Sequence, residues 1–134
     1  MSSKKDKSFI KYFEVGPYPE FWFGFTSSES AFQKELKRLN CLDYVEFTTK
    51  NATTHHLSKN DEVTYIVTID LTGCKTLSGI LGLLAHEAVH VWQGLLDYIG
   101  EKERPSSEIE AYHIQNISQA MFQEILKKYK VEKK

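Results

Sequence analysis

The residues of this chain with the clearest chemical potential form a short run in its second half, His86-Glu87-Ala88-Val89-His90. Two histidines four positions apart lie one above the other on a helix face, so both imidazoles can reach one zinc ion at about 2.0–2.1 Å. The glutamate after the first histidine points roughly 100° further around the helix. From there Glu87 can take a proton from a water that the metal activates. The run therefore predicts a zinc site with His86 and His90 as ligands and Glu87 as general base.

A catalytic zinc site also needs a third protein ligand and an open position for water. The metzincin pattern supplies a third histidine on the same stretch, but Gln93 and Leu96 stand where its glycine and histidine would be. Further along the chain, Glu108 and Glu110 stand at the start of the next predicted helix, where either could face the histidines across an antiparallel helix pair. Ser107 and Glu110 also match a capping box, which would give Glu110 a structural role instead.

A His-Glu-x-x-His helix followed by a helix that opens with Glu-x-x-Ala, here Glu108 to Ala111, resembles the gluzincin metallopeptidases. Single-domain minigluzincin-like proteins and short phage-encoded metallopeptidases are the most similar kinds, over residues 21–129. The resemblance implies that Glu108 is the third zinc ligand, with Glu110 as the alternate, and that the substrate is a peptide or protein. Many gluzincins carry an acid four residues after that ligand, where this chain has Tyr112.

Other polar side chains are candidates for supporting roles around the metal. Asp97 and Asp70 could orient a ligand histidine, as carboxylates often do in zinc sites. Tyr112, His113 and Tyr65 could each donate a hydrogen bond to the oxyanion that forms when a peptide carbonyl is attacked. Zinc is the only cofactor that these patterns predict.

The elements that must position these residues follow from hydrophobic periodicity. Residues 76–99 carry apolar side chains at helical spacing, with the histidine run in their middle. Gly100 is a natural helix stop, and a second helix with an apolar stripe is predicted from Ser106 or Ser107 to about Tyr129. Two consecutive helices joined by a short charged loop can therefore carry the whole predicted ligand set.

The first half of the chain predicts a small sheet and one helix. Residues 31–39 have helical spacing and end near Asn40, after hydroxyl side chains suited to an N-cap. The β-branched and aromatic segments 21–25, 44–49 and 63–71 predict strands, and residues 52–57 predict an edge strand. His55 and His56 in that edge strand point to opposite faces and cannot easily share a metal.

These elements predict an α+β fold, a minimal zincin-like domain. A sheet of three to four strands would pack on the metal helix and the following glutamate helix. The length of 134 residues fits one domain, 1–134, with lysine-rich frayed ends at residues 1–7 and 128–134.

Composition excludes several classes of function. The net charge is −1 and the lysines are spread along the chain, so we expect no nucleic-acid partner. The central apolar segment is interrupted by His86, Glu87 and His90, and no signal-like start is visible, so we expect no membrane partner and a cytoplasmic location. Cys41 and Cys74 are expected to be separate thiols. The oligomeric state does not follow from the sequence.

Two other functions fit the same residues. One is a non-catalytic accessory or binding protein with a zincin fold, either stabilised by zinc or free of metal. The other is a different zinc amidohydrolase, although the glycine-cysteine signature of deformylases is missing around both cysteines. The presence of the base, Glu87, favours an enzyme, because a degenerate site could lose that residue first.

Overall fold

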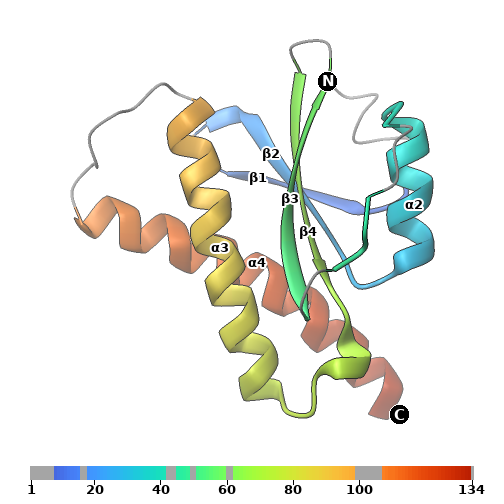
Figure 1. Ribbon diagram of the computed structural model, residues 1–134. Coiled ribbons are helices and arrows are strands. Elements are labelled where there is room, and N and C mark those ends of the chain that lie inside the picture. Colours follow the sequence, from blue (N-terminus) through green and yellow to red (C-terminus); the bar gives the residue numbers. More distant parts are fainter. Residues whose placement is uncertain are drawn as a thin grey trace. The chain divides into compact units, whose positions relative to one another are not determined.

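The computed structural model describes residues 8–15, 18–41, 45–48, 51–59, 62–98 and 107–133. Its described elements are a four-stranded mixed sheet and three α-helices, which confirms the α+β fold class. By its internal contacts the chain divides into two units, Met1–Lys75 with the sheet and one helix, and Thr76–Lys134 with the other two helices (Figure 1). The predicted frayed start, residues 1–7, lies outside the described residues. The prediction of one domain over 1–134 stays a prediction.

The sheet of the first unit has the strand order β1-β2-β4-β3 (Figure 1). β2 and β4 run parallel, whereas β1 pairs with β2 and β3 pairs with β4 in antiparallel fashion. The edge position predicted for residues 52–57 is confirmed, because β3 has a single neighbour. β1, which the sequence analysis did not predict, is a five-residue strand next to the lysine-rich start. The strands are β1 (Lys11–Val15), β2 (Tyr18–Thr26), β3 (Ala52–Lys59) and β4 (Glu62–Ile69).

Helix α2 (Glu29–Arg38) begins and ends as its sequence predicts. The Ser28 side chain accepts a hydrogen bond from the Ala31 amide and so caps the first turn. At the other end Asn40 has a φ of 60°, the left-handed conformation that asparagine tolerates better than most residues. The Cys41 amide then donates to the Leu36 carbonyl at 2.8 Å, which closes the helix in a Schellman arrangement.

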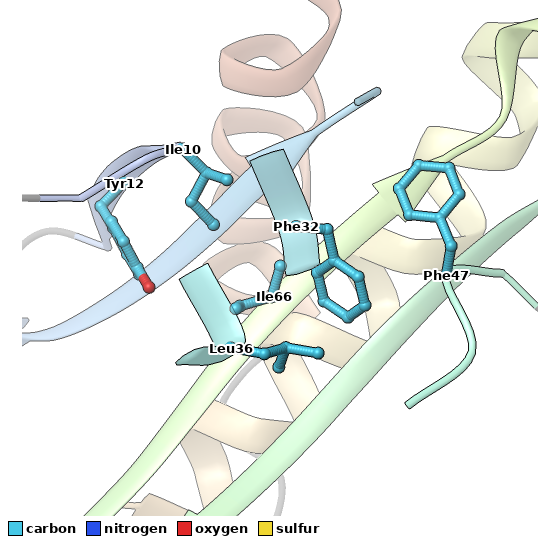
Figure 2. Close-up of a cluster of buried hydrophobic side chains, with 6 residues drawn as sticks. All are labelled: Ile10, Tyr12, Phe32, Leu36, Phe47 and Ile66. Atoms are coloured by element: carbon cyan, nitrogen blue, oxygen red, sulfur yellow. The ribbon is translucent and has the colours of Figure 1, made fainter. Parts of the chain in front are cut away.

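Apolar side chains between α2 and the sheet form the core of the first unit. Figure 2 shows Phe32 and Leu36 of α2 beside Ile66 of β4. Gly24 of β2 pairs with Ile66 on one side and with Tyr12 on the other. A methyl group at Gly24 would come within 2.6 Å of the Ile10 Cδ1 atom, so an alanine there would force the Ile10 side chain to move. The remaining members of the cluster in Figure 2 are Ile10, Tyr12 and Phe47.

The strand predicted over residues 44–49 is wrong for its described part, because residues 45–48 form no strand. The sheet has the order β1-β2-β4-β3, and this segment is not one of its strands. Its carbonyl groups accept from side chains instead: Gln33 Nε2 donates to the Val45 oxygen at 3.2 Å, and Thr68 Oγ1 donates to the Phe47 oxygen. The alternating pattern reflects the burial of Phe47 in the core and not strand pairing.

One fully buried carboxylate, Glu35 of α2, joins the helix to the start of the chain. It accepts hydrogen bonds from Tyr12 Oη at 2.7 Å and from the Phe9 amide at 2.9 Å. It also forms an ion pair with Arg38, whose guanidinium donates to both carboxylate oxygens. Burial raises the pKa of Glu35, but the hydrogen bonds from Arg38, Phe9 and Tyr12 outweigh it and hold the pKa below its usual value. Burial, together with the neighbouring carboxylate, raises the pKa of Tyr12.

We expect Glu35→Gln to lower the free energy of unfolding at pH 7 by about 2–4 kcal/mol, because the amide removes the charge that pairs with Arg38 and replaces one buried acceptor oxygen by a donor. Since the pKa of Glu35 is lower in the folded chain, its stabilisation is present above the usual value of 4.5 and is lost as the pH falls through the folded-state pKa. The difference between the variant and the wild type should therefore shrink below pH 4.5. Urea unfolding at several pH values measures it.

The matched control is Glu29→Gln, an exposed glutamate in the first turn of the same helix. That change should cost less than about 1 kcal/mol. An equal decrease in the free energy of unfolding for Glu35→Gln and Glu29→Gln would contradict a special stabilising role for the buried Glu35 carboxylate.

Candidate metal centre

Helix α3 (Leu77–Tyr98) carries the histidine run and spans the segment predicted at residues 76–99. Thr76 caps it, since its Oγ1 accepts from the Gly79 amide at 3.0 Å. Its buried apolar side chains fall on one arc of the helix: Ile80, Leu84, Ala88, Val91, Trp92 and Leu95. The opposite arc is exposed and carries Gly82, His86, His90, Gln93 and Asp97. We call this second set the exposed arc of α3.

The structure brings His86 and His90 together on the exposed arc. Their ring centroids are 5.0 Å apart and the ring planes are inclined at 73°. Two imidazoles bound to one tetrahedral zinc ion at about 2.0–2.1 Å would have centroids about 5 Å apart. The observed spacing therefore fits a shared zinc ion, and both side chains are accessible from solvent.

Glu87 lies next to the pair but on the edge of the buried arc, and its exposed fraction is 4%. Its position one residue after His86 places it about 100° further around the helix, as a base beside a metal requires. Burial keeps the carboxylate from turning freely into solvent. The three residues of the run thus differ in environment, with two exposed imidazoles and one buried carboxylate on adjoining faces.

The His90 ring has a hydrogen-bond partner on its own helix. His90 Nδ1 lies 3.1 Å from Gln93 Oε1, one turn later on the exposed arc. A carboxamide oxygen can only accept, so Nδ1 carries the proton and Nε2 keeps the lone pair of the neutral ring. This is the tautomer in which Nε2 can bind a metal.

Glu110, the alternate third ligand, lies in helix α4 (Ser107–Lys133), which packs on α3 (Figure 1). Its Oε2 accepts a hydrogen bond from Trp92 Nε1 at 2.7 Å. Trp92 is two residues after His90 and so about 200° around α3 from it. This oxygen of Glu110 is therefore engaged on a side of α3 away from His90. The predicted capping box stays a prediction, because the Ser107 side chain lies outside the described part of the structure.

Glu108, the first choice for the third ligand, lies in the first turn of α4, but its side chain is outside the described part of the structure. The positions three, four and seven residues later are Ala111, Tyr112 and Gln115, and all three are exposed. Within the described side chains, no three histidine, cysteine, aspartate or glutamate residues are close enough together to hold a metal ion. Of the predicted ligand set, the structure therefore brings together the two histidines.

The predicted supporting residues take different places. Tyr112 is 59% exposed, and Asp97 is exposed on the same arc as the histidines. The His113 ring stacks on Trp92 with centroids 4.9 Å apart, and its Nδ1 donates to the Ile109 carbonyl at 2.9 Å. His113 therefore packs between the two helices of its unit.

The candidates in the first unit have structural partners. The Tyr65 ring stacks on His56, with centroids 4.8 Å apart. Asp70 caps the short helix η1 (Leu71–Gly73) through the Thr72 amide and hydroxyl. The two strand histidines differ as expected of opposite faces: His56 is exposed, whereas His55 is buried and its Nε2 donates to the Phe47 carbonyl at 2.9 Å.

Two hydrogen bonds of the second unit were not predicted from the sequence, namely the Gln93–His90 bond and the Trp92–Glu110 bond. A signal for the first was present in the sequence, because residues three apart are neighbours on a helix and a carboxamide can accept from an imidazole. No such signal existed for the second, since it depends on how α4 packs on α3.

We expect Trp92→Phe to lower the free energy of unfolding by about 1–3 kcal/mol, because the Glu110 carboxylate loses its indole donor in a partly buried place. Glu110→Gln keeps an acceptor oxygen and should cost less. Thermal and urea unfolding of the two variants measure both effects. A smaller loss for the tryptophan change than for the glutamine change would contradict this assignment.

Comparisons with protein-family models, with curated proteins and with solved structures gave no match to this chain. Among the described residues, no helix has both the length and the apolar character needed to cross a membrane. Cys41 and Cys74 are both free thiols, as expected. The candidate metal centre consequently depends on the chemistry and geometry of its own residues.

Proposed function

We propose that this protein is a zinc-dependent metallopeptidase in which His86 and His90 hold the metal and Glu87 is the general base. The observation that carries the proposal is the pair of exposed imidazoles with centroids 5.0 Å apart, next to a buried carboxylate on the same helix. Imidazole and carboxylate ligands suit zinc, and an exposed pair leaves positions open for water and substrate.

Glu108 is proposed as the third ligand. Glu110 is the weaker candidate, because its Oε2 already accepts from the Trp92 indole. The Glu108 side chain lies outside the described part of the structure, and the helix positions that follow it at one-turn spacing are exposed. The resemblance to gluzincins independently favours the same residue.

Zinc, when bound, would lower the pKa of a coordinated water and polarise the scissile carbonyl. Glu87 accepts the proton that the attacking water loses, and it later returns this proton to the nitrogen of the leaving amine. Its burial supports this role, since a carboxylate held in a low-dielectric place keeps one orientation towards its partner.

The surroundings of the histidines suit an extended substrate. Gly82 lies one turn before His86 on the exposed arc, and a methyl group added there would meet no atom within 4 Å. The surface one turn before His86 is therefore open, and a peptide backbone could lie there. This openness supports a polymer substrate over a small molecule enclosed in a pocket.

We expect one zinc ion per chain in the wild type by elemental analysis, and its loss in His86→Ala, His90→Ala and Glu108→Ala. Glu110→Ala should keep the zinc while lowering the melting temperature, because its indole partner is left unpaired. Retention of zinc in the His90 variant would contradict the ligand assignment. Loss of zinc in the Glu110 variant, with retention in the Glu108 variant, would reverse the choice of third ligand.

We expect Glu87→Gln to bind zinc as the wild type does but to hydrolyse peptides at least about 100-fold more slowly, because the amide cannot accept the proton. A library of fluorogenic peptides incubated with zinc-loaded protein provides the measurement. Glu29→Gln, an exposed substitution of the same kind on α2, is the control. Zinc binding by the wild type without turnover of any peptide would favour the non-catalytic accessory protein.

A further inference from the structure

Gln93, on the exposed arc of α3, is in direct contact with the candidate ligand His90. Gln93 lies one turn after His90, and its Oε1 is 3.1 Å from His90 Nδ1. On the assumption that the proposed zinc site is correct, we propose that Gln93 is a positioning residue for the metal, which orients the His90 ring and sets its tautomer.

The tautomer follows from the atoms in contact. Because Oε1 of Gln93 has no proton to give, the proton of the neutral imidazole must be on Nδ1. The Nε2 lone pair is then directed away from Gln93 and is available to a metal. In zinc sites the ligand histidine usually donates its other N–H to a carboxylate, a carbonyl or a water. A carboxamide oxygen on the same helix supplies that acceptor here.

The helix itself makes the bond possible. Residues three positions apart are neighbours on the helix surface, so the backbone of α3 holds Gln93 near His90 at no additional cost in chain entropy. The corresponding position after His86 is Val89, whose side chain has no acceptor. The two ligands thus differ, and only His90 receives an orienting partner from its own helix in the described structure.

The effect should be moderate, because both residues are exposed and water competes for the same bond. Removal of an outer partner of a ligand histidine typically weakens metal binding 10–100-fold, and we expect the lower end of that range. The change should leave the fold of the metal-free protein intact, since Gln93 is not part of the buried arc.

The experiment compares zinc affinity, by competition with a chromophoric chelator, for the wild type, Gln93→Ala, Gln93→Glu and the control Gln119→Ala, an exposed glutamine of α4. We expect Gln93→Ala to bind zinc about tenfold more weakly. Gln93→Glu should restore the affinity, because a carboxylate oxygen accepts the same proton. Gln119→Ala should match the wild type.

A second readout needs no metal. Long-range ¹⁵N–¹H correlation spectra of the metal-free protein distinguish a proton on Nδ1 from one on Nε2 for each histidine. We expect His90 to carry its proton on Nδ1 in the wild type and to shift towards Nε2 in Gln93→Ala. His113 is the internal reference, because its Nδ1 donates to a backbone carbonyl that neither change touches.

The outcomes separate the two proposals. Zinc binding by the wild type with equal affinity in Gln93→Ala would overturn the role of Gln93 and leave the zinc site standing. A proton on Nε2 of His90 in the wild type would also overturn that role. Failure of the wild type to bind zinc would overturn the proposed function and, with it, the positioning of a metal ligand.

Discussion

The helical repeat of α3 is the constraint on which the candidate site depends. With about 3.6 residues per turn, the four-residue spacing of His86 and His90 puts both rings on one face, and the one-residue step to Glu87 turns that carboxylate towards the buried arc. The same repeat brings Gln93 beside His90. On the other side of the helix, the apolar residues of the buried arc are removed from solvent. One secondary-structure element therefore fixes the mutual geometry of two proposed ligands, a base and an orienting partner.

Several buried polar groups in the described parts of both units have hydrogen-bond partners on other elements, and these bonds help to fix how the elements pack. Glu35 joins α2 to the start of the chain through Tyr12 and Arg38. The carbonyl of Phe47 receives the Thr68 hydroxyl, which holds residues 45–48 in place without strand pairing. In the second unit the Trp92 indole donates to Glu110 and so joins α3 to α4. Each bond offsets the cost of removing a polar atom from water, and each has one geometry, so it adds specificity that hydrophobic contacts lack.

Sequence reasoning succeeded where a local pattern determines structure and failed where a distant partner decides it. The ends of α2 were predictable because Ser28 and Asn40 act within one turn of themselves. The segment 44–49 resembled a strand because Phe47 is buried, but the carbonyl groups of Val45 and Phe47 accept from the side chains of Gln33 and Thr68, which are distant in the sequence. The bond of Glu110 to Trp92 could not be predicted, because Trp92 lies on another helix and is 18 positions away in the sequence.

The sequence by itself determined the α+β class, the three helices, most of the strands and the His86-Glu87-His90 run, since each depends on residue spacing along one element. Tertiary structure decided that Glu110 of α4 bonds to Trp92 of α3, because the rotation of one helix against another depends on the shapes of all the side chains between them. It also decided strand order and the burial of Glu35 and His55. Periodicity is a property of neighbouring residues, whereas partnership between elements depends on the whole packed unit.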